Sequence, residues 1–358
     1  MRSYHLVPDT AAGMVVRRRP VPVPGAGEVL VRMRAASLGF RDVLVGEGDY
    51  PLPVSPGVVA GCEGAGDVVD VGAGAARFKP GDRVALTVFP DWLDGPFDVE
   101  HAAQLGTTRD GTLTEYAVVP ESALVPVPDH LSHAEAAALP LTAVTAWNAL
   151  TGGRRVLPGE TVVATGTGGV ALAVVQLAAL AGAHVVVTTG DPGKAERLRA
   201  LGAHAVVDRR GDWPAEVRTL TAGRGAALVV DVAGALGESV RAAAIGGEVA
   251  YVGYRVADAP TGPPVDVRAL FDAGVRIRPL AVGSRAQFLE LTRALAVHGV
   301  HPVLDREFAF DEAAEAYARH RSGQAFGKVV VTFPTGDRPA SASDAEFPGN
   351  LSRELAGH

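Results

Sequence analysis

The sequence contains a single cysteine, Cys62, among its 358 residues. One thiol cannot form a disulfide within the chain, and such sparse use of cysteine is typical of a reducing compartment. Uninterrupted apolar runs of about 18 residues, as a membrane span needs, are missing, and so is the apolar core of a signal peptide. We therefore expect a cytoplasmic protein.

An excess of positive charge is also missing, because the formal net charge is −7. Nothing in this composition would attract nucleic acid or an anionic membrane, so we expect neither as a partner and a small-molecule substrate instead. The length exceeds what one compact core usually holds, so we expect two lobes.

Short β-type runs separated by turns fill the first third of the chain, which predicts a mostly antiparallel β lobe over residues 1–130. The rhythm then changes to a helical segment at 132–150, where Ser132 is a candidate N-cap and Glu135 completes a capping box. Apolar strands alternating with helices follow to residue 282 and predict a parallel sheet covered on both faces. We expect residues 283–334 to return to the first lobe and residues 335–358 to form a flexible tail.

A glycine-rich turn follows the apolar strand at 161–165. The residues from Gly166 to Ala171 fit the pattern G-x-G-x-x-A. Gly166 permits a tight turn, Gly168 allows a pyrophosphate to approach the backbone, and Ala171 allows close packing of helix on strand. The next helix would offer its first N–H groups, at Gly169 and Val170, to the phosphates. The turn predicts a dinucleotide cofactor.

The end of the second strand of that sheet bears on the choice between NADPH and NADH. Enzymes that use NAD usually place an acid there, whereas this chain has Thr189 with Lys194 close behind. Arg209, after the next strand, could contact a 2′-phosphate or stack on adenine. We predict NADPH; the alternative is that Lys194 and Arg209 are surface charges and Asp191 restores NAD binding.

Several segments resemble the medium-chain dehydrogenase/reductase superfamily, and the resemblance extends to about residue 334. They are "GCEGAGDVVDVGAGAARFKPGDRV", "GTLTEYAVVP", "AAALPLTAVTAWNAL", "GTGGVALAVVQLAALAGA" and "GKVVV". "FRDVLVGEGDYP" and "VFPDWLDGP" further resemble its zinc-type alcohol dehydrogenase-like and quinone oxidoreductase-like branch. The resemblance implies an α/β fold with a GroES-like catalytic domain, a Rossmann doubly wound parallel-sheet domain and, commonly, a homodimer.

Zinc members of that family hold a catalytic metal at three positions, which correspond here to Gly39, Cys62 and Leu141. Glycine and leucine offer no donor atom, and a catalytic zinc needs three protein ligands. The four cysteines of the family's structural zinc are missing too. We therefore predict an enzyme without zinc. Cys62 is then either a small apolar side chain beneath the active site or a thiol close to the substrate.

Candidate catalytic residues cluster in "GFRDVLVGEGDYP". Arg41 could polarise a carbonyl oxygen or hold a cofactor phosphate, and Asp42 matches an aspartate of the family. Tyr50 could donate a hydrogen bond or a proton. The alternative is that Arg41 and Asp42 form a structural ion pair and Tyr50 is pocket wall. Trp92 could shape the substrate cavity or a dimer edge.

The nicotinamide end of the cofactor has its own candidates. Thr145 is expected near the ring, while Gly253 and Val282, at two strand ends, could offer backbone groups to the carboxamide.

Without a metal to lower a hydroxyl pKa, conjugate reduction is easier than alcohol oxidation. We therefore predict NADPH-dependent reduction of an α,β-unsaturated carbonyl or a quinone. The alternatives are reduction of a ketone or aldehyde, and a cofactor-binding protein whose redox activity is lost.

Overall fold

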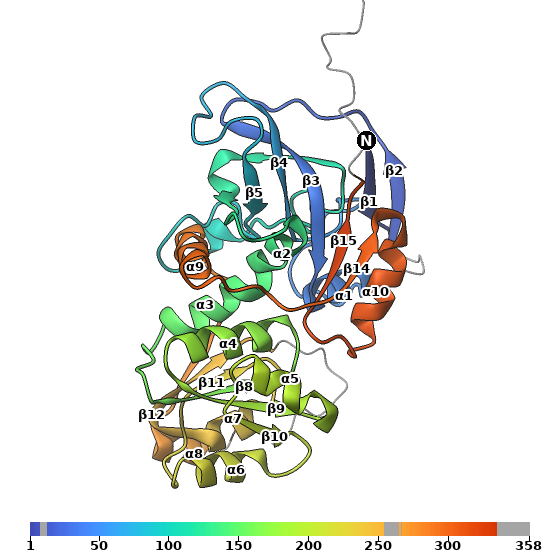
Figure 1. Ribbon diagram of the computed structural model, residues 1–358. Coiled ribbons are helices and arrows are strands. Elements are labelled where there is room, and N and C mark those ends of the chain that lie inside the picture. Colours follow the sequence, from blue (N-terminus) through green and yellow to red (C-terminus); the bar gives the residue numbers. More distant parts are fainter. Residues whose placement is uncertain (8–12, 254–264, 266, 335–358) are drawn as a thin grey trace, which may run out of the picture.

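The computed structural model describes residues 1–7, 13–253, 265 and 267–334, so the predicted tail at 335–358 lies outside the described residues. Figure 1 shows two lobes, with strands β1 to β5, β14 and β15 in one and β8 to β12 in the other. Within the described ranges, no helix is long and apolar enough to cross a membrane.

The first lobe is built on a seven-stranded sheet, in which β15 of the C-terminal segment pairs antiparallel with β3 and places Val330 opposite Ser37. A separate antiparallel pair, β1 with β2, lies in the same lobe. The strands of the first lobe are β1 (Arg2–Leu6), β2 (Met14–Arg18), β3 (Glu28–Leu38), β4 (Glu63–Val71), β5 (Arg83–Leu86), β6 (Tyr116–Pro120), β7 (Leu124–Pro126), β14 (Leu304–Ala309) and β15 (Lys328–Thr332).

The second lobe is built on a six-stranded parallel sheet of order β10-β9-β8-β11-β12-β13. This is the doubly wound order of dinucleotide-binding domains, so the predicted fold class is confirmed. Its strands are β8 (Thr161–Thr165), β9 (His184–Thr189), β10 (Ala205–Asp208), β11 (Ala226–Asp231), β12 (Ala243–Tyr251) and β13 (Arg276–Pro279).

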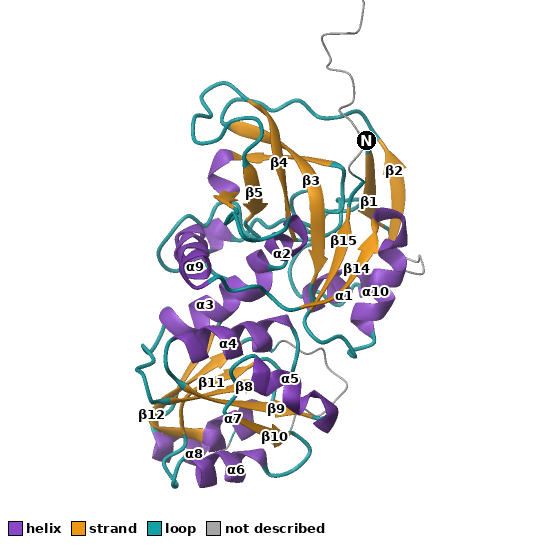
Figure 2. Cartoon of the chain, viewed as in Figure 1, coloured by secondary structure: helices purple, strands orange, loops and turns teal. Residues whose placement is uncertain are grey.

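Alternate residues of the parallel strands enter different hydrophobic clusters, because successive side chains of a strand point to opposite faces. Val162 and Ala164 of β8 join the cluster under α4 and α5, whereas Val163 joins the one under α6 and α7. Figure 2 shows these helices around the sheet. The helices are α1 (Phe40–Glu47), α2 (His133–Ala137), α3 (Val144–Thr151), α4 (Gly169–Leu180), α5 (Ala195–Ala200), α6 (Trp213–Leu220), α7 (Leu236–Ala242), α8 (Val267–Ala273), α9 (Arg285–His298) and α10 (Ala313–Arg321).

The helical segment predicted at 132–150 leads from one lobe to the other. Ser132 caps it as predicted, since its side chain accepts the Glu135 N–H while the Glu135 carboxylate accepts the Ser132 N–H. The segment is interrupted: α2 ends at Ala137, a π-helical turn spans Leu139–Ala143, and α3 follows. Pro140 lies in this turn and has no N–H to donate, which favours a break there. The break carries Leu141 into the site described next.

Candidate active site

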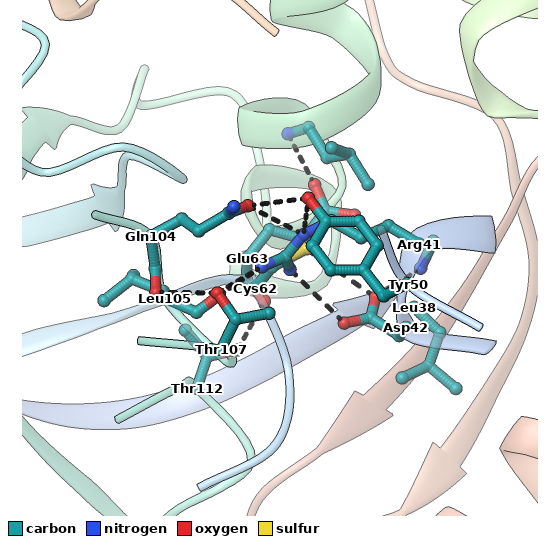
Figure 3. A network of polar contacts seen from close by, with 12 residues as sticks. Leu38, Arg41, Asp42, Tyr50, Cys62, Glu63, Gln104, Leu105, Thr107 and Thr112 are labelled. Atoms are coloured by element: carbon teal, nitrogen blue, oxygen red, sulfur yellow. Dashed lines mark hydrogen bonds and ion pairs between the residues drawn. The ribbon is translucent and has the colours of Figure 1, made fainter. Parts of the chain in front are cut away.

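Cys62 lies at the centre of the site and is completely buried. Val88, Phe89 and Trp92 pack around it, and its Sγ lies 3.6 Å from Asp42 Oδ2 (Figure 3). Burial, and after it the Asp42 carboxylate, raise the pKa of the Cys62 thiol well above its usual value. The thiol therefore stays protonated at neutral pH, which favours the structural interpretation of Cys62.

This burial predicts an unreactive thiol. We expect Cys62 not to react with a disulfide reagent in the folded protein at about pH 8, where an ordinary exposed thiol reacts readily. The reagent cannot reach the buried side chain, and the thiol is not ionised. Thiol titration in native buffer and again in denaturant measures the effect. Fast stoichiometric labelling of the folded enzyme would instead favour a thiol that is open to the substrate.

The three positions that correspond to zinc ligands do come together in space. A Cβ on Gly39 would lie only 2.2 Å from Leu141 Cδ2, and Leu141 also packs against the Cys62 cluster. Hydrocarbon therefore fills the space beside Gly39, and Asp42 Oδ2 accepts the Gly39 N–H at 2.8 Å. No group of three or more His, Cys, Asp or Glu side chains in the described part of the chain is arranged to hold a metal. This donor set does not fit a catalytic zinc.

Arg41 is held by neighbouring acceptors on all but one of its nitrogens. Its Nε donates to Gln104 Oε1 at 3.1 Å and to the Tyr50 hydroxyl at 3.3 Å. Its Nη2 donates to the Leu105 carbonyl at 2.8 Å and to Thr107 Oγ1 at 3.3 Å. Nη1 lies 3.8 Å from Asp42 Oδ1 and, buried, has no hydrogen-bond partner among the described residues. Arg41 and Asp42 thus form only a loose ion pair.

Tyr50 is tied to the same group. Its hydroxyl donates to Gln104 Oε1 at 3.0 Å and accepts from Arg41 Nε, while the Arg41 guanidinium lies 5.2 Å from the centre of its ring. The single hydroxyl proton of Tyr50 is therefore engaged, so the hydroxyl would have to leave Gln104 before it could protonate a substrate.

A buried ion pair between Glu63 and Lys328, which no sequence pattern predicted, lies beside Cys62 and the side chains packed around it. Lys328 Nζ donates to Glu63 Oε1 at 2.6 Å and to the Leu38 carbonyl, and Glu63 Oε2 accepts the Leu141 N–H at 2.8 Å. Both side chains are almost completely buried. The sequence contained one indication of this pair, a charged residue at the start of the apolar strand "KVVVT", but no local pattern identified the partner of that residue.

The glycine-rich turn lies directly against Lys328. Gly166 has φ +91°, a left-handed conformation that favours glycine, and Gly168 forms a β-bridge with Gly327. A Cβ on Gly169 would lie 2.6 Å from the Lys328 side chain. The predicted cofactor turn and Cys62 are therefore connected through Lys328 and Glu63. Val170 lies in the first turn of α4, as predicted.

The residues predicted to bind the adenosine end of the cofactor lie near the glycine-rich turn and the end of β9. Lys194 Nζ donates to Thr167 Oγ1 at 3.2 Å, which places its charge beside the glycine-rich turn. Arg209 crosses the end of β9, where a Cβ on Gly190 would lie 2.7 Å from its Nε. The Asp191 carboxylate accepts the Gly193 N–H at 2.9 Å, and Thr189 Oγ1 accepts the Asp191 N–H at 3.1 Å. Asp191 is thus engaged in local turn formation.

Of the residues predicted to lie at the nicotinamide end of the cofactor, two lie beside Cys62 and the third follows strand β12. The Thr145 hydroxyl donates to the Leu141 carbonyl at 2.6 Å, and Val282 packs against the Cys62 cluster, so both lie beside the site. The Val282 carbonyl already accepts from Asn148 Nδ2 at 3.1 Å. Gly253 follows β12, and its N–H donates to the Asp231 carbonyl at 2.9 Å.

This fold and this site define a class of protein: a two-lobed oxidoreductase in which a dinucleotide-binding sheet adjoins a GroES-like catalytic lobe. Residues 25–129 match the alcohol dehydrogenase GroES-like domain, and residues 169–297 match the zinc-binding dehydrogenase family. The chain belongs to the medium-chain dehydrogenase/reductase superfamily and is an oxidoreductase that uses a nicotinamide cofactor.

Its relatives carry both names expected for this branch. The zinc-type alcohol dehydrogenase-like protein C1773.06c of Schizosaccharomyces pombe is 38% identical over 314 residues, which are 85% of this chain and 90% of that protein. The chloroplast envelope quinone oxidoreductase homolog of Arabidopsis thaliana is 30% identical over 92% of this chain and 97% of its own length. The crystal structure of an NAD-dependent alcohol dehydrogenase matches with a TM-score of 0.83 and 34% identity, covering 93% of this chain and 99% of that one.

Proposed function

We propose that the protein reduces an α,β-unsaturated carbonyl or a quinone with NADPH and without a metal. The observation that carries this proposal is the position of the Arg41 guanidinium. Four acceptors hold its Nε and Nη2, and its Nη1 has no hydrogen-bond partner among the described residues. The positions that correspond to the family's zinc ligands hold Leu141 and Cys62 instead. A fixed cation can stabilise the negative charge of an enolate or a quinol oxygen as that charge forms.

In this mechanism the bound nicotinamide supplies the hydride. Conjugate reduction places the hydride on the β-carbon and spreads the resulting charge onto oxygen, which requires hydrogen bonds and a positive charge but no strong Lewis acid. Arg41 supplies that charge, Tyr50 and Gln104 orient Arg41, and the apolar side chains of Phe89, Trp92 and Leu141 pack beside the site. The enolate takes its proton from solvent, because the Tyr50 hydroxyl donates to Gln104.

The test is the consumption of NADPH with p-benzoquinone and 2-cyclohexenone, set against cyclohexanone and benzaldehyde. We expect turnover with the first two and deuteride from labelled NADPH on the β-carbon of the enone. Turnover of the saturated ketone or the aldehyde alone, with deuteride on the carbonyl carbon, would favour the second candidate, a carbonyl reductase. The alcohol dehydrogenase named among the relatives supports that candidate.

The proposed preference for NADPH rests on Lys194 and Arg209, which lie at the adenosine end of the predicted cofactor site. Replacing Lys194 by Ala is expected to lower the ratio of kcat/KM for NADPH over NADH about tenfold or more, because a hydrogen bond to a charged group is worth roughly 1.5–3 kcal/mol. Lys79→Ala, at an exposed turn of the other lobe, is the matched control and is expected to leave the ratio unchanged. An unchanged ratio in Lys194→Ala would remove this residue from the proposal.

We also propose that the enzyme is a homodimer, on the strength of the family resemblance. Sedimentation equilibrium measures the mass directly, and a monomer mass near 36.8 kDa would contradict the proposal.

A further inference from the structure

The Gln104 side chain connects the two polar residues of the site. It is 1% exposed, and its Oε1 accepts both from Arg41 Nε and from the Tyr50 hydroxyl. Figure 3 shows Gln104 on one side of the Tyr50 ring and Asp42 on the other. Gln104 thus binds both the cation and the phenol of the site through one oxygen atom.

The chemistry of the donors determines how the Gln104 amide is oriented. Arg41 Nε can only donate, so the amide must present its oxygen to it. The Tyr50 hydroxyl then gives its one proton to the same oxygen and accepts the second contact of Arg41 Nε. One donor of this group, the buried Arg41 Nη1, has no hydrogen-bond partner among the described residues.

The backbone around Gln104 is itself held in place. Its N–H donates to Thr108 Oγ1 at 3.0 Å, and its carbonyl accepts the Arg109 N–H at 3.1 Å. The same turn supplies the Leu105 carbonyl and the Thr107 hydroxyl that hold Arg41 Nη2. One short segment therefore provides three of the four acceptors of the guanidinium.

We propose that Gln104 is a positioning residue, whose amide oxygen holds Arg41 and Tyr50 in register so that Arg41 Nη1 is presented to the oxygen of the substrate. This inference rests on the proposed function for its kinetic consequences. Buried polar groups without partners are uncommon in native proteins, so Arg41 Nη1 is the donor that we assign to the substrate oxygen.

Two variants of similar shape test the role. Gln104→Leu removes the acceptor, and Gln104→Glu keeps two acceptor oxygens in the same place. Loss of a partner that orients a metal ligand typically costs about 10- to 100-fold in activity, and we take the same scale for a partner that orients Arg41. We expect such a loss of kcat in Gln104→Leu, with the KM for NADPH unchanged, and substantial recovery in Gln104→Glu. Equal losses in both variants, or wild-type kcat in Gln104→Leu, would overturn the proposal.

A second readout does not depend on turnover. The NMR signal of the Arg41 Nε–H, assigned by its disappearance in Arg41→Lys, is expected to exchange slowly with water in the wild type and in Gln104→Glu but fast in Gln104→Leu. Slow exchange in Gln104→Leu would overturn the proposal, whatever the substrate. If the wild type oxidises NADPH with none of the probes, the proposed function fails and this readout still decides the role of Gln104.

Arg109→Gln is the matched control for the same turn. It removes the partly exposed ion pair of Arg109 with Asp91, 2.7 Å apart, and leaves the contacts of the Gln104 side chain intact. We expect kcat and the exchange of the Arg41 Nε–H to stay at their wild-type values. A change in Arg109→Gln as large as that in Gln104→Leu would mean that any disturbance of the turn suffices, which contradicts a specific role for the amide.

Discussion

Replacing Lys328 by Met is expected to lower the free energy of unfolding by about 3–5 kcal/mol, because it leaves the Glu63 carboxylate without its cation in a fully buried place. Lys328 and Glu63 are 3% and 0% exposed, and their charged atoms are 2.6 Å apart. Glu63 also holds the Leu141 N–H, and Lys328 holds the Leu38 carbonyl. Urea unfolding followed by circular dichroism and by tryptophan fluorescence measures the loss.

The double variant Glu63→Gln with Lys328→Met is the decisive comparison. It leaves no buried charge, and we expect it to be considerably more stable than Lys328→Met alone, since buried ion pairs can often be replaced by uncharged side chains at little cost. Lys79→Met, at an exposed turn, should change the stability by less than about 0.5 kcal/mol. Additive losses in the double variant would show that the two side chains act independently.

The loss in Lys328→Met should also depend on pH. Burial raises the pKa of Glu63 above its usual value, and the charge of Lys328 offsets part of this rise. A carboxyl whose folded-state pKa is raised contributes its stability below the unfolded-state pKa and loses it as the pH rises through the folded-state pKa. Without Lys328 the pKa of Glu63 rises further, so the deficit relative to wild type should be larger at neutral pH than in acid and shrink as the solution is acidified. A deficit that grows in acid would contradict this assignment.

Replacing Arg41 by Met is expected to lower kcat for an enone or quinone about 10²- to 10³-fold, the usual effect of removing one preorganised group that stabilises an oxyanion. Burial by itself lowers the pKa of a guanidinium, but the groups around Arg41, Asp42 among them, raise it above its usual value. Arg41 therefore stays charged at neutral pH. Steady-state kinetics with saturating NADPH measures the effect.

Arg41→Lys keeps the charge but cannot reproduce the planar fork that contacts Gln104, Leu105 and Thr107, so we expect an intermediate loss. NADPH binding, followed by fluorescence, should be nearly unchanged in both variants and shows that the protein is folded. A kcat within a fewfold of wild type in Arg41→Met would assign Arg41 to structure and would remove the observation that carries the proposed function.

Local patterns predicted much of the fold. The β3 strand spans Glu28–Leu38, within the first third of the chain where short β-type runs were predicted, and the Ser132–Glu135 capping box forms as expected. These features depend on neighbours two to four residues apart, which a sequence displays directly. The helix predicted at 132–150 is interrupted by the π-helical turn at Leu139–Ala143, where the Leu141 N–H bonds to Glu63, 78 residues away. No local pattern contains that partner.

The same distinction applies to the site. The glycine-rich turn and the missing zinc ligands could be identified by counting residues, because each depends on residue type at short spacing. Gln104 and the pair of Glu63 with Lys328 could not be identified in this way, since their partners lie 63 and 265 residues away. Polar residues gain a role at such distances only when the fold removes water from around them and leaves one partner within reach.

By itself, then, the sequence determined that a dinucleotide turn opens a parallel sheet and that Gly39 and Leu141 offer a metal no donor atom. Only the tertiary structure decided what stands in that place: the Leu141 side chain packed over Gly39, a protonated Cys62, and an arginine held by Gln104. The reason is physical, because short-range backbone geometry follows from adjacent residues, whereas burial and charge pairing exist only after distant segments have packed together.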